Sequence, residues 1–132
     1  MTNEQQKIRI DFDARTQRFL AFVFMEVFGG GSTAAIQKIL GDFVDVARDL
    51  RPIVKAQSES DSEYLELTAS QWRVMYESLN AVIYGLGPGE LQTCTGTYLH
   101  EAANINLKIC SAVWGAYLGR YRWDDVKTKR IE

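Results

Sequence analysis

The residues of this chain best suited to metal chemistry lie close together in its second half. Cys94, His100, Glu101 and Cys110 are of the types that bind zinc, and His100 is the only histidine. Zinc sites are commonly marked by close ligand pairs, such as C-x-x-C or H-x-x-x-H. These four residues have no such spacing, so we predict no metal site. Because the sequence gives no sign of an oxidising compartment, we expect two free, mostly buried thiols.

Carboxylate pairs occur without the groups that acid–base catalysis needs. Asp42 with Asp45, and Asp124 with Asp125, are close in sequence, but no nucleophile or base motif accompanies either pair. The run Gly29-Gly30-Gly31-Ser32 lacks the lysine and the glycine spacing of a phosphate-binding loop. We therefore predict that the chain is not an enzyme, has no catalytic residues and needs no cofactor.

Acidic residues are concentrated in one part of the chain. The formal net charge is −2, yet between residues 56 and 107 the only base is Arg73. We predict that six acids of this segment form a partner-facing surface: Glu59, Asp61, Glu63, Glu66, Glu77 and Glu90. A field of one sign speeds association with an oppositely charged protein. The alternative is an acidic surface that faces only solvent.

This charge pattern favours a basic protein partner over nucleic acid. Our hypothesis is a non-enzymatic protein-binding protein, of the kind of an immunity or antitoxin-like inhibitor of a basic partner such as a toxin. The alternative is a helix-turn-helix-like DNA-binding regulator, because a short helix, a glycine and a longer helix are expected in each half. DNA affinity depends on neutralising phosphates, which a chain with a pI of about 5.5 does poorly.

Length and composition are those of one globular domain. The 132 residues are 46% hydrophobic and 24% charged, which are ordinary values for a folded domain. The longest nearly uninterrupted apolar run, Phe19 to Phe28, contains Glu26 and is about half the ~20 residues that span a bilayer. The first residues lack the apolar core of a signal peptide. We expect residues 1–132 to form a single cytoplasmic domain without membrane contact.

An internal repeat organises the elements that position these residues. Ile10 to Val54 aligns without a gap with Leu65 to Ile109, 55 positions later. Seven pairs are identical, including Gly30/Gly85 and Gly41/Gly96, and most other pairs keep their chemistry. We predict a first repeat over 8–55, an acidic linker over 56–63, a second repeat over 64–119 and a charged C-terminal tail over 120–132.

Each repeat is predicted to begin with a strand that leads into a helix. Residues 8–12 and 64–67 alternate between polar and apolar side chains, as half-buried strands do. Asp13 and Thr68 then have the side chains of helix N-caps. The helices over 14–28 and 69–84 are expected to cross at the centre of the fold, since the first of them is apolar on nearly every side.

A short helix and a longer helix complete each repeat. In the first repeat we expect the longer helix to end or kink at Pro52, because proline lacks the N–H that the helix needs. The predicted fold class is mostly α (α+β): two β-α-α-α repeats related by a pseudo-twofold axis in a single domain, with a small two-stranded antiparallel ribbon. The repeats are expected to pack as an intramolecular pseudo-dimer. The oligomeric state of the whole chain stays open.

Part of the second repeat resembles a family of small uncharacterised bacterial proteins. The resemblance rests on Leu79-Asn80-Ala81-Val82, Gly85, Glu90-Leu91, Thr93, Gly96, Glu101-Ala102 and Ile109. These residues resemble the family's pattern, which consists of a Leu-Asn-Glu-Val helix end, a glycine, a turn with Thr-Arg-x-Gly and a helix with Glu-Ala. The chain departs from this pattern at Cys94, where arginine is usual, and at Asn106, where an apolar residue is usual. The resemblance implies no catalytic residues.

Overall fold

The computed structural model describes residues 7–29, 33–60 and 62–120. The described chain is mostly helical with two short strands, which confirms the predicted mostly α class. In chain order the elements are β1 (Lys7–Asp11), α1 (Ala14–Gly29), α2 (Thr33–Leu40), the 3₁₀ helix η2 (Gly41–Phe43), α3 (Val44–Ser58), β2 (Tyr64–Thr68), α4 (Ala69–Thr95) and α5 (Leu99–Arg120). Asp61 and the tail from residue 121 onward lie outside the described residues.

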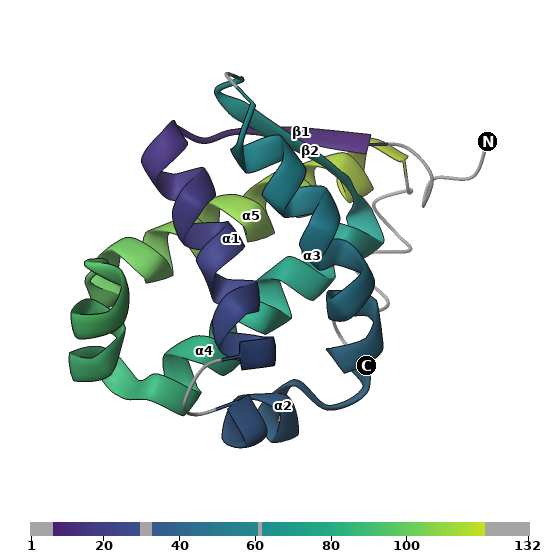
Figure 1. Ribbon diagram of the computed structural model, residues 1–132. Coiled ribbons are helices and arrows are strands. Elements are labelled where there is room, and N and C mark those ends of the chain that lie inside the picture. Colours follow the sequence, from purple (N-terminus) through teal and green to yellow (C-terminus); the bar gives the residue numbers. More distant parts are fainter. Residues whose placement is uncertain (1–6, 30–32, 61, 121–132) are drawn as a thin grey trace.

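The two strands form an antiparallel ribbon at one end of the helical body (Figure 1), which confirms the predicted pairing. Ile10 stands opposite Leu65, and Ile8 stands opposite Leu67. Side chains alternate between the faces of a strand, and these four apolar side chains are buried or half-buried against the helices. The inner face of the ribbon is therefore part of the hydrophobic core.

Side-chain caps start the helix that follows each strand. The Asp13 Oδ1 accepts a hydrogen bond of 2.8 Å from the backbone N–H of Thr16 at the start of α1. At the start of α4, the Thr68 hydroxyl accepts from the N–H of Gln71 at 3.2 Å, and the Gln71 side chain accepts in return from the N–H of Thr68. Both predicted caps are confirmed, and each pairs a helix N–H that has no partner within the helix.

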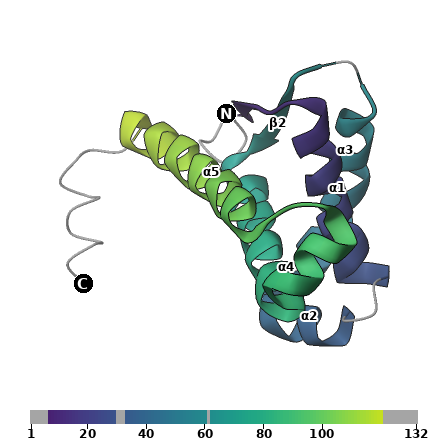
Figure 2. The same ribbon diagram turned by 90° about the vertical axis from the view of Figure 1, so that its left-hand side faces the viewer.

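α1 and α4 pack against each other in the interior. Each contributes large side chains that are fully buried, among them Leu20, Val23 and Phe24 of α1 and Trp72, Met75 and Leu79 of α4. Burying one such side chain is worth roughly 1.5–3 kcal/mol. α3 packs along α1 and α5 along α4, so the last helix of each half lies beside the first (Figure 2).

α3 does not end at Pro52, which was one of the two outcomes that we predicted there. The helix continues for two further turns to Ser58. Proline leaves the carbonyl four residues earlier without its helical partner, but Leu50 and Val54 on either side of Pro52 are fully buried. Gln57 also exchanges hydrogen bonds of 3.0 and 2.9 Å with the backbone of Glu66 on β2. These tertiary contacts offset one missing backbone bond.

The helical path of α4 is interrupted later than the glycine-rich sequence suggested. Gly85 remains helical, and the break falls at Gly87, which has a φ of 81° and separates two helical segments. At position 85 glycine is needed for close helix packing, not for a special backbone conformation. A Cβ built on it would lie 2.5 Å from Cγ1 of Ile36, so only glycine lets α2 approach α4 so closely at this point.

Among the described residues, no single helix is both long enough and apolar enough to cross a membrane. α1 and the segment Thr33–Ser58 reach the required length and composition only when taken together across a bend of 103°.

Candidate functional site

Five of the six acids predicted to face a partner lie in the described residues, and the structure divides them between two regions. Three lie on the connection from α3 to β2 and on β2 itself: Glu59, Glu63 and Glu66. Two lie on α4, on opposite sides of the break at Gly87: Glu77 and Glu90. The structure therefore brings three of them to the neighbourhood of the ribbon and places Glu90 on the separate second segment of α4.

None of these five carboxylates makes an ion pair within the described residues. The ion pairs found there join Arg9 to Asp11, Arg15 to Glu101 and Arg48 to Asp45. Glu59, Glu63 and Glu90 are exposed, while Glu66 and Glu77 are half-buried. An exposed carboxylate that is not held in an ion pair keeps part of its field toward solvent, where an approaching protein meets it.

Two further acids lie near the ribbon, although they were not among the six predicted to face a partner. The N–H of Phe12 donates a 3.0 Å hydrogen bond to the carbonyl of Glu63, which places Asp11 and Asp13 at the same end of the ribbon as Glu63. Asp11 is paired with Arg9 at 3.1 Å. The hydrogen bond from the backbone N–H of Thr16 lowers the pKa of Asp13 below its ordinary value. Asp13 is therefore an anion at neutral pH.

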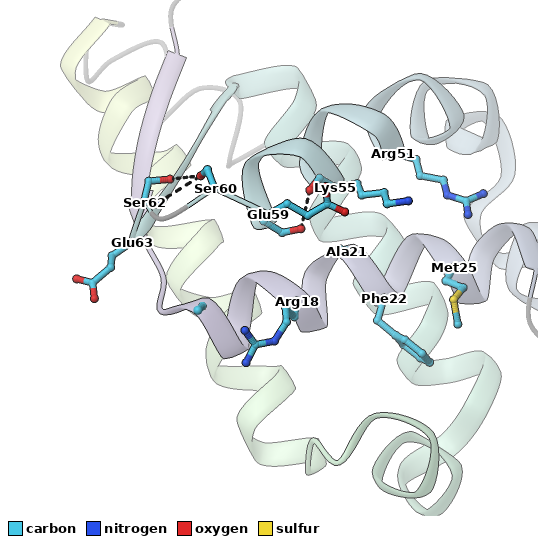
Figure 3. Close-up of a pocket in the computed structure, with 12 residues that line it drawn as sticks. Arg18, Ala21, Phe22, Met25, Arg51, Lys55, Glu59, Ser60, Ser62 and Glu63 are labelled. Carbon is cyan, nitrogen blue, oxygen red and sulfur yellow. Dashed lines mark hydrogen bonds between the residues drawn. The ribbon is translucent and has the colours of Figure 1, made fainter.

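A groove of about 710 Å³ lies beside this end of the ribbon, between α1, α3 and the connection to β2 (Figure 3). Its apolar side chains come from α1: Ala14, Ala21, Phe22 and Met25. Its polar side chains are three cations, three serines and two carboxylates: Arg18, Arg51, Lys55, Ser58, Ser60, Ser62, Glu59 and Glu63. The groove thus joins an apolar strip to charges of both signs.

The three cations of the groove make no ion pair within the described part of the chain. Arg51 and Lys55 stand one turn apart on α3, and Arg18 comes from α1 (Figure 3). Sequence reasoning missed this cluster. The signal was the four-residue spacing of Arg51 and Lys55, which places them on one face of a helix. Because we expected the helix to end or kink at Pro52, we did not treat Arg51 and Lys55 as neighbours on one helical face.

Comparison of the chain with protein-family models, with curated proteins and with solved structures finds no match.

The described residues contain no cluster of three His, Cys, Asp or Glu side chains able to hold a metal ion. The side chain of Cys94 lies outside the described part of the chain. His100 lies at the exposed start of α5, where its ring stacks on Tyr98 with the centroids 5.8 Å apart. Glu101 accepts from the N–H of Tyr98 and lies 3.7 Å from Arg15. Cys110 is a free, half-buried thiol.

A side chain from a neighbouring helix contacts the backbone of one residue on each strand of the ribbon. Gln57 of α3 occupies the outer backbone groups of Glu66 on β2, and the ammonium group of Lys108 on α5 donates to the carbonyl of Asp11 on β1. An open strand edge invites pairing with another chain. A strand added at Glu66 or at Asp11 would have to displace these contacts, which disfavours pairing at those two residues.

Proposed function

We propose that this chain is a non-enzymatic protein-binding protein whose partner is basic, of the immunity or antitoxin type that inhibits a toxin. The observation that supports this most directly is the lack of an ion pair, within the described residues, at all five described acids of the predicted surface. Complementary charge of this kind raises association rates by roughly ten- to a thousandfold at low salt. An inhibitor that must reach its target quickly benefits from such rates.

Two regions of the acidic surface are separable by mutation. The variant Glu59→Lys/Glu63→Lys reverses the charge beside the ribbon, and Glu77→Lys/Glu90→Lys reverses the charge on α4. Asp42→Lys/Asp49→Lys is the matched control, because Asp42 and Asp49 are exposed, lie outside the predicted surface and produce the same change in net charge.

The test begins with the wild-type chain, immobilised and exposed to lysate of the cells that encode it, with bound proteins identified by mass spectrometry. We expect a basic protein that is retained at low salt and released as salt rises. Association of that protein, measured by surface plasmon resonance, should slow by about tenfold or more for a reversed binding region and stay nearly constant for the control. Capture of no basic protein, or equal rates for all variants, contradicts the proposal.

The alternative function is a DNA-binding regulator built on a helix-turn-helix-like arrangement. The second segment of α4, the left-handed Gly96 (φ 72°) and α5 supply a short helix, a turn and a long helix. Near its start α5 exposes His100, Asn104 and Lys108. Salt-dependent binding of duplex DNA that is lost in Asn104→Ala and is not weakened by the acid reversals supports this alternative.

We also propose that the two halves are repeats related by a pseudo-twofold axis through the ribbon. Ile10 and Leu65, which the repeat makes equivalent, stand opposite each other. Three element boundaries recur 55 positions apart: the starts of α1 and α4, the ends of α2 and α4, and the starts of α3 and α5. In an experimentally determined structure, a half-turn about one axis should superpose residues 10–54 on 65–109. A translation, or two unlike folds, contradicts the repeat.

A further inference from the structure

We propose that the groove between α1 and α3 binds an acidic peptide segment that carries apolar side chains. This site is distinct in its chemistry from the acidic surface proposed to bind a basic protein, and its existence does not depend on that surface. It rests on two features of the groove, an apolar strip along α1 and a set of unpaired cations on both of its sides (Figure 3).

The apolar strip is open to a ligand. Phe22 is half-buried and Met25 is 46% exposed, and Ala21 also lines the groove. A single exposed apolar side chain is ordinary, but apolar side chains that line a concave site provide surface for a partner. Methionine has a flexible side chain that adapts to apolar groups of different shape. The strip is therefore suited to the apolar face of an amphipathic segment.

Charge complementarity defines the rest of the ligand. Arg51 and Lys55 reach the groove from α3, and Arg18 reaches it from α1. No carboxylate is paired to these cations among the described residues. They can therefore donate hydrogen bonds to the carboxylates of a ligand, on both sides of the apolar strip. Arginine binds carboxylates through two parallel hydrogen bonds. A segment with apolar side chains in its centre and acids along its flanks matches this arrangement.

The end of the groove near the ribbon sets the direction and the class of ligand. Glu63 lies at that end, and Glu59 follows Lys55 by one helical turn (Figure 3). The acids of the segment therefore lie over Arg51 and the side of Lys55 away from Glu59, and an uncharged or basic residue lies near the two glutamates. A nucleic-acid strand carries a phosphate at every step. It would meet Glu59 and Glu63 wherever it followed the groove. The mixed charge therefore favours a peptide over a nucleic acid.

Three fluorescent synthetic peptides test the proposal by fluorescence anisotropy with the full chain. The first has leucines at helical spacing flanked by glutamates, the second replaces each glutamate by lysine, and the third replaces each leucine by serine. We expect the first to bind, and the other two to bind at least about tenfold more weakly, because each lacks one of the two complementary features. No saturable binding of the first peptide up to about 1 mM, which corresponds to very weak affinity, overturns the proposal.

Variants locate the binding in the groove. Lys55→Glu should weaken binding of the acidic peptide by roughly three- to tenfold, and Arg51→Glu/Lys55→Glu should weaken it further. Lys38→Glu is the matched control, because Lys38 is exposed on α2, makes no ion pair within the described residues and lies outside the groove. Equal losses for Lys55→Glu and Lys38→Glu show a general charge effect and overturn the site.

Two controls address misfolding of the variants and binding of nucleic acid in the groove. Lys55→Gln, whose circular dichroism and melting temperature should match those of the wild type, must show an intermediate loss; this excludes an effect of misfolding. A single-stranded oligonucleotide that competes with the acidic peptide at equal affinity overturns the peptide assignment. The Glu59→Lys/Glu63→Lys variant should bind the acidic peptide more tightly, although it should bind the basic protein of the proposed function more slowly. The two proposals therefore fail independently.

Discussion

Asn106 on α5 donates a hydrogen bond of 2.7 Å to the side-chain oxygen of Asn80 on α4. Asn106 is only 6% exposed, and its own side-chain oxygen has no hydrogen-bond partner among the described residues. Asn80 explains how this polar residue is accommodated between two helices, since a buried amide is costly unless it is hydrogen-bonded.

We predict a measurable coupling between these two amides. Asn80→Ala and Asn106→Ala should each destabilise the fold, and the double variant should cost less than the sum of the two. A net hydrogen bond is worth about 1 kcal/mol, so the coupling free energy in a double-mutant cycle should be about 0.5–1.5 kcal/mol. Urea unfolding of the four proteins measures it. Strictly additive losses indicate that the bond contributes nothing to stability.

Ile10 and Leu65 are buried in equivalent surroundings if the pseudo-twofold axis passes between them. The exchange Ile10→Leu/Leu65→Ile keeps the total volume and should cost less than about 1.5 kcal/mol. Ile10→Ala and Leu65→Ala, which serve as reference, should each cost about 2–5 kcal/mol. Guanidinium unfolding compares them. An exchange as costly as either alanine variant shows that the two positions differ in shape and argues against the axis.

Gly85→Ala should destabilise the chain although alanine favours helices. The new Cβ would lie 2.5 Å from Cγ1 of Ile36, and such overpacking costs about 1–3 kcal/mol. The gain in helix propensity of up to about 1 kcal/mol does not offset it. Gly115→Ala on α5 is the control, because its Cβ would meet nothing within 4 Å. That variant should melt at a higher temperature than the wild type, whereas Gly85→Ala should melt at a lower one.

Asp13 makes the stability of the fold depend on pH. Its pKa is lowered in the folded chain, first by the backbone hydrogen bond from Thr16. The stabilisation is therefore present above the ordinary pKa of an aspartate and is lost as the pH falls through the lowered folded value. Asp13→Asn keeps a capping side chain, so wild type and variant should differ more at about pH 7 than at about pH 2 in urea unfolding. A difference that does not change with pH contradicts this assignment.

Local features of this fold could be predicted from the sequence because they depend on nearest neighbours in the chain. The alternation of Ile8 and Ile10 predicted a strand, and an acid directly before the helix predicted the cap at Asp13. Gly41 and Gly96, at matching positions of the proposed repeat, both adopt left-handed conformations, with φ of 64° and 72°. Each of these features follows from the stereochemistry of a few adjacent residues.

The candidate site could be predicted only in part. The sequence identified the excess of acids, but counting charges along a chain does not show which cations lie beside them. Arg18 from α1 reaches the same groove as Lys55 from α3 and Glu59 from the connection to β2. That neighbourhood arises from the packing of α1 against α3, which brings together Arg18 and Lys55 although they lie 37 positions apart in the chain (55 − 18).

Tertiary contacts also determined where the local conformational preferences of single residues are not followed. The sequence by itself specified a strand and a set of helices in each half, since periodicity and caps are encoded locally. It did not specify that α3 continues through Pro52, that Gly85 stays helical against Ile36, or that Asn106 meets Asn80. In each case a contact between distant segments outweighs a local preference of about 1–3 kcal/mol, and such contacts exist only once the helices have packed.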